Sequence, residues 1–250
     1  MALARDTSLL DELAADAAEG LTRYRMCGPG ARVGVALSGG MDSWSLLALL
    51  DHLRRTDRFP YPLTALHIDL GYPGAARRLQ TLTAGCHRAE IPLIVRHTAI
   101  GPESLAAEKV RPCFLCARRR RQALYEIAAR ENLTHLATGH HRDDVLASFF
   151  MNLIENRELS TLLPRQEAFQ GRFQLIRPLY LVPKKRLIKL QRQQNFPVFS
   201  SGCPVDGQTR RRAAEELVVE IERRFPGSSE AIFQALHRPK TDFLPVRDPS

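Results

Sequence analysis

The stretch that most constrains this chain is RVGVALSGGMDS at residues 32–43. Its apolar residues Val33, Val35 and Leu37 alternate with small ones, which predicts a short buried β-strand. Two glycines follow, and an apolar-rich segment at residues 44–53 then predicts a helix. Adjacent glycines let a ligand approach the backbone, and a helix N-terminus favours an anion. The stretch therefore predicts a phosphate-binding turn.

The turn lacks the GxxxxGK[ST] spacing of a Walker A loop. Its pattern, SGGxDS, resembles the pyrophosphate loop of the N-type ATP pyrophosphatases, also called PP-loop enzymes, which cleave ATP between the α and β phosphates to adenylate a substrate. Two glycines alone would fit an ordinary turn between a strand and a helix, and the flanking polar residues favour the phosphate site. The resemblance implies that ATP contacts Ser38, Gly39, Gly40, Asp42 and Ser43.

Strand and helix signals alternate along the first part of the chain. Further strands are predicted at residues 63–68, 92–97 and 135–138, and helices at 7–25, at 75–89, from 117 and from 145. The alternation predicts an α/β fold, namely a Rossmann-like parallel twisted sheet with helices on both faces. Residues 98–112 lack periodicity and contain a glycine and two prolines, which predicts a long loop.

The C-terminal third is poor in strand signals and has two basic segments that predict helix starts. We therefore expect a PP-loop ATP pyrophosphatase domain with an N-terminal helix at residues 1–180. A helical extension that carries a further cysteine is expected at residues 181–250. Residues 237–250 contain three prolines and predict a tail or an extended arm.

Polar residues follow two of the predicted strands, at the sheet edge where ligands bind in such folds. Asp69 either frames the adenosine, as the resemblance implies, or caps the following turn. The second group is GHHRDD at residues 139–144, where we expect Gly139 and His140 to contact ATP.

Carboxylates at a nucleotide site can hold the Mg²⁺ that bridges the phosphates. The sequence predicts Asp42 and Asp144 in this catalytic role. Asp143 or Asp144 could instead cap the helix that follows.

Cysteines form one short motif, CFLC at residues 113–116. Such a pair is a metal site or a redox pair more often than a structural disulfide in an intracellular protein. Four arginines at residues 118–121 begin a helix directly after it, and we expect this charge and the helix N-terminus to lower the pKa of the thiols. Cys27 and Cys86 lie outside any motif and are interpreted as small buried hydrophobic residues.

The chain of 250 residues carries a net charge of +9, which favours a polyanionic partner such as nucleic acid. No apolar run is long enough for a bilayer, and the acidic N-terminal segment fits neither a signal nor a transit peptide. We therefore expect a cytoplasmic protein without a membrane partner. The basic residues that could bind RNA are Arg118, Arg119, Lys184, Lys185, Arg210 and Arg211.

SGGxDS, CxxC and GHHRDD, in this order, resemble the tRNA 2-thiocytidine synthetase branch of the PP-loop family, over most of the chain. The resemblance implies that the protein adenylates a cytidine in the tRNA anticodon loop with ATP and Mg²⁺ and replaces its C2 oxygen with sulfur. It implies a [4Fe–4S] cluster on Cys113, Cys116 and Cys203 with one iron left open. It also implies tRNA as a partner and a cysteine desulfurase or another sulfide donor. No separate RNA-binding domain is evident in the sequence, so we expect RNA to bind on the catalytic domain, where a homodimer could share it.

Two positions depart from the pattern of that branch. Met41 stands where the branch usually has lysine, and Ser200 and Ser201 stand where it often has a second downstream cysteine. Other branches, including tRNA lysidine synthetase, accept varied residues at the position of Met41. Two alternatives therefore stay open. One is a PP-loop enzyme that adenylates a different RNA base or a small molecule, for lysidine-type ligation or another thiolation. The other is a zinc-bearing RNA-binding protein without catalysis.

Overall fold

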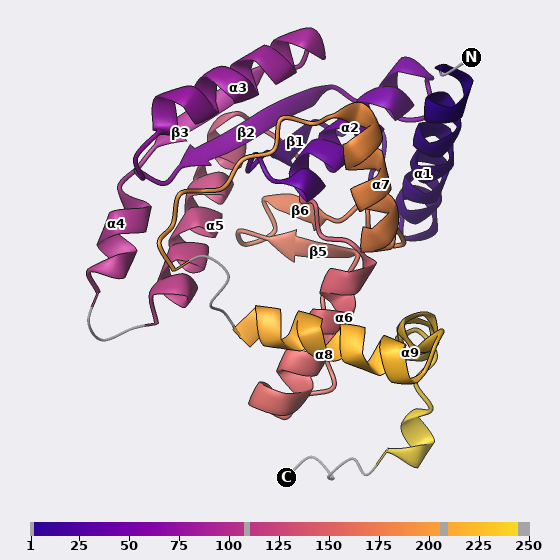
Figure 1. The fold of residues 1–250 in the computed structure, drawn as a ribbon. Helices are drawn as coiled ribbons and strands as arrows, with labels where there is room; N and C mark the ends of the chain where they lie inside the picture. The colour runs from indigo at the N-terminus through magenta and orange to yellow at the C-terminus, as the bar shows by residue number, and fades with distance from the viewer. Residues whose placement is uncertain (1–2, 108–110, 206–209, 245–250) are drawn as a thin grey trace. The chain divides into compact units, whose positions relative to one another are not determined.

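A computed structural model describes residues 3–107, 111–205 and 210–244, with only the backbone of residues 3–8. The chain divides into two compact units (Figure 1). The first comprises Met1–Arg142 and Leu163–Thr209, and the second comprises Asp143–Leu162 and Arg210–Ser250. The boundary expected after residue 180 falls inside the first unit, which also contains Cys203.

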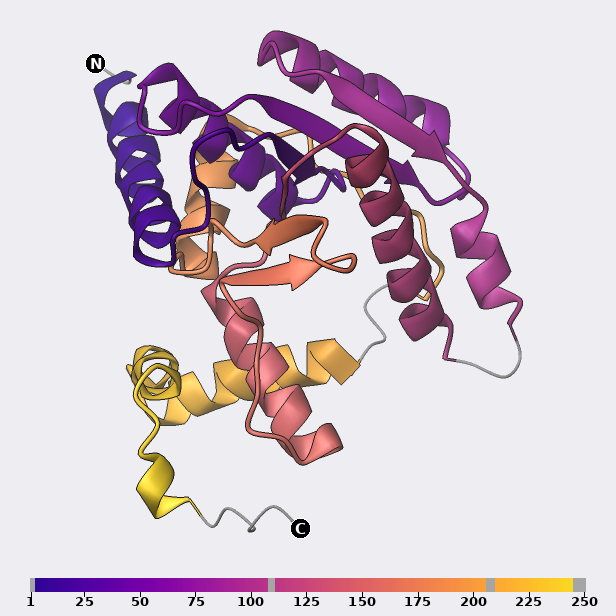
Figure 2. The same ribbon diagram turned by 180° about the vertical axis from the view of Figure 1, so that it is seen from behind.

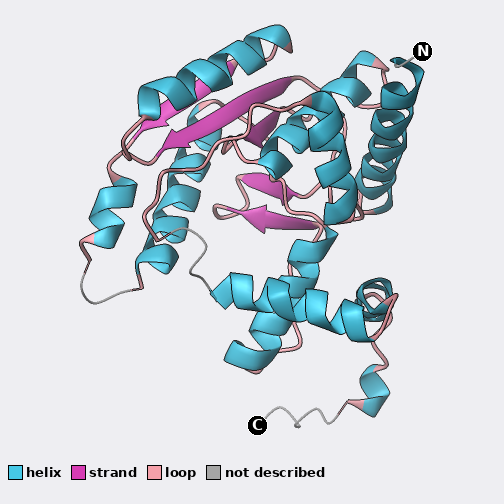
Figure 3. Ribbon diagram, in the orientation of Figure 1, coloured by secondary structure: helices cyan, strands magenta, loops and turns pink. Residues whose placement is uncertain are grey.

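The first unit contains a six-stranded sheet with the strand order β3-β2-β1-β4-β6-β5 (Figure 3). The strands are β1 (Val33–Ala36), β2 (Leu63–Asp69), β3 (Leu93–His97), β4 (His135–Ala137), β5 (Arg165–Ala168) and β6 (Phe173–Ile176). All neighbours pair in parallel except β5 and β6, which are antiparallel. The four predicted strands and the parallel sheet are confirmed, whereas β5 and β6 were not predicted.

Helices cover both faces of this sheet, as expected (Figures 1 and 2). On one face α1 (Leu3–Arg23), α2 (Met41–Arg55) and α7 (Lys184–Gln194) pack against one another. The third helix, α3 (Ala75–Arg88), lies beside α2, where Gly85 leaves room for the ring of Trp44. On the other face α5 (Pro112–Arg130) packs on β2 and on the short helix α4 (Ile100–Leu105).

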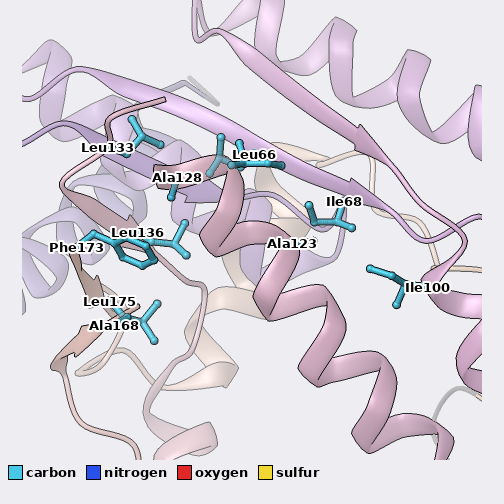
Figure 4. Packing of buried hydrophobic residues seen from close by; sticks show 11 residues of the cluster. Leu66, Ile68, Ile100, Ala123, Ala128, Leu133, Leu136, Ala168, Phe173 and Leu175 are labelled. Atoms are coloured by element: carbon cyan, nitrogen blue, oxygen red, sulfur yellow. The ribbon is translucent and has the colours of Figure 1, made fainter. Parts of the chain in front are cut away.

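The core between α5 and the sheet fixes the position of the cysteine-bearing helix (Figure 4). Ala123 and Ala128 of α5 pack in one cluster with Leu66 of β2, Leu136 of β4 and Phe173 of β6, and all five are buried. Replacing a buried phenylalanine with alanine typically costs about 3–5 kcal/mol. The CxxC segment is therefore carried by a helix that is anchored in the core.

The prediction of a long loop at residues 98–112 is wrong for much of this segment. Residues 100–105 form α4, and Pro112 is the first residue of α5. Proline suits that position because the first helical N–H has no partner within the helix. Both cysteines of the motif consequently lie in α5 itself, and residues 108–110 are outside the described residues.

The second unit is helical in the part that the structure describes. It contains most of α6 (Arg142–Met151), a π-helical turn (Asn152–Asn156), α8 (Arg210–Arg224), α9 (Ser228–Leu236) and a 3₁₀ turn (Thr241–Phe243). An ion pair of 3.0 Å between Arg210 and Glu155 joins α8 to the π-helical turn. The 3₁₀ turn lies in the predicted tail, and residues 245–250 fall outside the described residues. Across the described ranges, no helix has both the length and the apolar character that a membrane span requires.

Candidate active site

The glycine turn lies where the strand order reverses. β1 is flanked by β2 and β4, and in open α/β sheets ligands bind beyond the strand ends at such a point. Gly39 has φ +88°, a conformation that favours glycine. The hydroxyl of Ser43 accepts a hydrogen bond from the Gly39 N–H (3.2 Å) and donates one to the Gly40 carbonyl (2.8 Å). The Ser43 side chain therefore stabilises the conformation of the turn.

The N-terminus of α2 opens from this turn. Gly40 is the N-cap residue, and among the described residues no side chain caps this helix end. The N–H groups of a first helical turn have no carbonyl partner within the helix, and the helix dipole adds positive potential there. Asp42 lies in that first turn. This helix end can accept an anion such as a phosphate, and the aspartate is in place for a bridging cation.

The loop after β4 lies against the same helix start. A Cβ atom on Gly139 would come within 2.9 Å of the backbone oxygen of Asp42, so only glycine allows this approach. His140 hydrogen-bonds through Nδ1 to the hydroxyl of Thr138 (2.9 Å). His141, which was not predicted as a site residue, is buried, and its Nε2 lies 3.7 Å from Asp42 Oδ1. The two glycine-bearing loops and Asp42 thus form one site.

Asp69 is the last residue of β2 and is buried. Its carboxylate accepts hydrogen bonds from the Gly71 N–H (3.1 Å) and from His97 Nδ1 (3.0 Å). Burial is the largest single effect and acts to raise the pKa of Asp69, but the two hydrogen bonds and the nearby imidazoles of His97 and His67 together lower it. This geometry includes the turn cap that was one of the two expectations, and contact with adenosine stays a prediction.

Asp144 lies in the second compact unit, near the start of α6. It is buried, and its carboxylate accepts a hydrogen bond from Arg211 of α8. Its role in holding Mg²⁺ stays a prediction.

The cysteines of the motif and Cys203 are neighbours in the first unit. Figure 1 shows the segment after α7, drawn in orange, crossing β1 and β2 towards the start of α5. Cys203 accepts a hydrogen bond at Sγ from the hydroxyl of Tyr72 (3.3 Å). Both Cys203 and Cys113 act to raise the pKa of Cys116, which places the three thiols within electrostatic reach of one another. All five cysteines of the chain are free thiols. Within the described residues, no three His, Cys, Asp or Glu side chains are already arranged to hold a metal ion.

The expectation of lowered thiol pKa values is wrong for Cys116. Burial is the largest effect and raises the pKa of Cys116, and the neighbouring thiols raise it further. Arg120 lowers it, as expected, but does not outweigh burial.

The two remaining cysteines differ from each other. Cys86 is buried, as predicted, and burial raises its pKa to about 11. Cys27 is only half-buried, although burial still raises its pKa to about 12.

The basic residues predicted to bind RNA occur in both units. In the first, Arg118 is exposed on α5, Arg119 pairs with Glu103 at 2.8 Å, and Lys184 and Lys185 begin α7. In the second, Arg210 pairs with Glu155 and Arg211 with Asp144. Arg119, Arg210 and Arg211 therefore have acidic partners within the protein, and RNA binding stays a prediction.

Comparison with known proteins decides the family. A family model described as a PP-loop domain matches residues 14–201. A tRNA-cytidine(32) 2-sulfurtransferase of Pseudomonas putida (strain W619) is 33% identical over 221 residues, which cover 88% of this chain and 81% of that protein. The chain belongs to the PP-loop family, in the group of these sulfurtransferases. The resemblance found in the sequence is thereby confirmed.

A second curated relative agrees with this placement, and one solved structure shares the fold. The tRNA-cytidine(32) 2-sulfurtransferase of Geobacter metallireducens is 34% identical over 219 residues, covering 85% of this chain and 84% of that protein. The U34-tRNA thiolase NcsA from Methanococcus maripaludis, solved with its [4Fe–4S] cluster, shares the fold with a TM-score of 0.76. It is 23% identical and covers 93% of this chain and 79% of its own. At that identity the likeness shows the fold.

Proposed function

We propose that this PP-loop protein is an ATP-dependent tRNA thiolase that adenylates a cytidine of the anticodon loop and replaces its C2 oxygen with sulfur. The observation that carries the proposal is the presence, in one compact unit, of a glycine turn that leads into an uncapped helix N-terminus and of three neighbouring thiols. Relatives named tRNA-cytidine(32) 2-sulfurtransferase, at 33–34% identity, support cytidine in tRNA as the substrate.

The glycine turn supplies the first half of the reaction. The uncapped amides at the start of α2 hold the phosphates of ATP, and the helix dipole favours their charge. The C2 oxygen of the cytidine attacks the α-phosphorus, and pyrophosphate leaves with the electron pair of the broken P–O bond. Because the Ser43 hydroxyl holds the turn in one conformation, the amides at the start of α2 can stabilise the charge that develops without having to reorganise.

One of two acidic residues, Asp42 or Asp144, is proposed to hold the Mg²⁺ that accompanies ATP. Asp42 has the stronger structural support, because it lies in the first turn of α2. The buried side chain of His141 also lies next to its carboxylate. Asp144 is the second candidate.

The three cysteines supply the second half. Three thiolates from α5 and the segment around Cys203 fit a [4Fe–4S] cluster with one iron free of protein ligands. When bound, such a cluster supplies an open iron site that can carry sulfide. Sulfide adds to the activated C2 carbon, the C–O bond breaks, and AMP leaves with the former C2 oxygen. Adenylation is needed because an unactivated carbonyl oxygen is a poor leaving group.

The thiols also favour thiolation over lysidine-type ligation, since the latter joins an amine and needs no cysteine. The sulfide donor, the homodimer, the basic RNA contacts and the cytoplasmic location belong to this proposal as predictions from the sequence.

The test is anaerobic reaction of the iron–sulfur-reconstituted protein with unmodified tRNA, ATP, Mg²⁺ and a sulfide source. We expect 2-thiocytidine in the digested tRNA, together with AMP and pyrophosphate, and no product from the Cys203→Ala variant. Cys27→Ala is the matched control and should keep the activity. Bound zinc with no thiolated nucleoside would contradict the proposal.

A further inference from the structure

Tyr72 contacts the third cysteine of the site although it lies 131 residues away in the sequence. Its hydroxyl donates a hydrogen bond to Cys203 Sγ at 3.3 Å. The side chain is buried, with the residue only 6% exposed. A buried hydroxyl needs a partner, and in this position the partner is sulfur.

Neighbouring residues restrict the position of Tyr72. A Cβ atom on Gly101 would come within 2.5 Å of its Cζ, so the ring packs directly on that glycine. Arg78 donates a hydrogen bond through Nη2 to the Tyr72 carbonyl at 2.8 Å. These contacts leave the phenol little room to turn away from the sulfur.

The segment that carries Cys203 is shaped to meet the phenol. Gly202 has φ +80°, and a Cβ atom there would lie 3.5 Å from the Tyr72 Cβ and 3.3 Å from Arg78 Nη1. The hydroxyl groups of Ser200 and Ser201 accept hydrogen bonds from the N–H groups of Gly202 (3.3 Å) and Cys203 (3.2 Å). The two serines that replace the downstream cysteine of the branch therefore hold this turn.

We propose that Tyr72 is a positioning residue for Cys203, whose hydrogen bond orients the sulfur and withdraws electron density from it. The inference rests on the proposed role of Cys203 as a cluster ligand. Hydrogen bonds to ligand sulfurs are among the factors that set the reduction potentials of iron–sulfur clusters. A donor to sulfur favours the reduced cluster, which carries more negative charge, so Tyr72 raises the potential.

The test compares the midpoint potential of the reconstituted cluster in wild type, Tyr72→Phe and Tyr61→Phe. Tyr61 is the matched control, because its ring packs edge-on against Phe59 in the loop before β2. We expect Tyr72→Phe to have a more negative potential and Tyr61→Phe to match the wild type. An unchanged potential in a folded, cluster-bearing Tyr72→Phe would overturn the inference.

A second variant covers the case in which Tyr72→Phe does not fold or loses its cluster. Incorporation of 3-fluorotyrosine at position 72 keeps the ring and strengthens the hydroxyl as a donor. The potential should then move to a more positive value, and an unchanged or more negative value would overturn the inference.

The Cys203→Ala variant distinguishes failure of the ligand role of Cys203 from failure of the positioning role of Tyr72. If that variant keeps a full cluster, the ligand role in the proposed function fails, and the inference fails with it. If Cys203→Ala loses the cluster while both Tyr72 replacements leave the potential unchanged, only the inference about Tyr72 fails.

Discussion

The backbone N–H of Phe199 donates a hydrogen bond to the carbonyl of Gly39 at 3.2 Å. The ring of Phe199 covers the same glycine, since a Cβ atom on Gly39 would lie 2.1 Å from its Cζ. Four residues further along, Cys203 meets Tyr72. One short segment therefore contacts the phosphate-binding turn and delivers the third thiol.

Gly39→Ala should abolish or strongly weaken ATP–pyrophosphate exchange. The new methyl group meets two obstacles, a φ of +88° and the ring of Phe199. The left-handed backbone alone costs about 1–2 kcal/mol, and the ring adds to that cost.

The double variant Gly39→Ala/Phe199→Ala is the internal control. Removing the ring should recover part of the exchange activity, because only the backbone strain then remains. Full activity in the single variant would show that the turn does not need the conformation described here.

Gly139→Ala should lower the exchange rate roughly 10–100-fold by pushing the loop after β4 away from the start of α2. The new Cβ would lie 2.9 Å from the backbone oxygen of Asp42, which cannot move aside as a side chain end can. Gly28→Ala is the matched control, since a Cβ there meets no atom within 4 Å and its φ is not positive. Equal rates in the two variants would refute the close approach.

Cys203→Ala should reduce the iron and sulfide content of the anaerobically reconstituted protein far below that of the wild type. Two thiolates of one helix cannot replace a third ligand that comes from another segment. Cys86→Ala removes a thiol that is buried in α3 and should leave the iron content unchanged. Iron lost equally from both variants would indicate unfolding instead of loss of a ligand.

Asp69→Asn should remove an acid-dependent part of the stability. The native pKa of Asp69 lies below its ordinary value of 3.8, so its carboxylate stabilises the fold fully at pH values above the unfolded pKa. That stability is lost as the pH falls below 3.8 and through the native pKa. In urea unfolding between pH 6 and pH 2, the free energy of unfolding should therefore fall less with decreasing pH for Asp69→Asn than for the wild type. The exposed Asp57, changed to asparagine, should keep the wild-type profile. A wild-type profile in Asp69→Asn would contradict the assignment.

The sequence predicts those parts of the fold and site whose signals are local. The alternation of Val33, Val35 and Leu37 and the two glycines that follow are enough to place β1 and the turn. β5 could not be predicted because RQEA is a short polar edge strand whose backbone pairs with β6. α4 could not be predicted because Gly101 and Pro102, which lie within it, are residues typical of loops.

Contacts between distant residues that belong to no motif could not be predicted. Tyr72 and Phe199 carry no motif, and each gains its role from a partner far away in the chain. The raised pKa of Cys116 has the same origin, because its burial depends on tertiary packing while the nearby arginines are visible in the sequence. His141 could have been predicted as a site residue, because it is the second histidine of GHHRDD. Only the fold shows that it lies beside the carboxylate of Asp42.

The most direct test follows the oxygen that leaves the base. A tRNA transcribed with cytidine labelled by ¹⁸O at C2 is thiolated by the reconstituted protein, and the AMP released is analysed by mass spectrometry. If the glycine turn adenylates the cytidine before sulfide displaces AMP, the AMP carries one ¹⁸O for each 2-thiocytidine formed. Unlabelled AMP beside thiolated tRNA would contradict adenylation of the base.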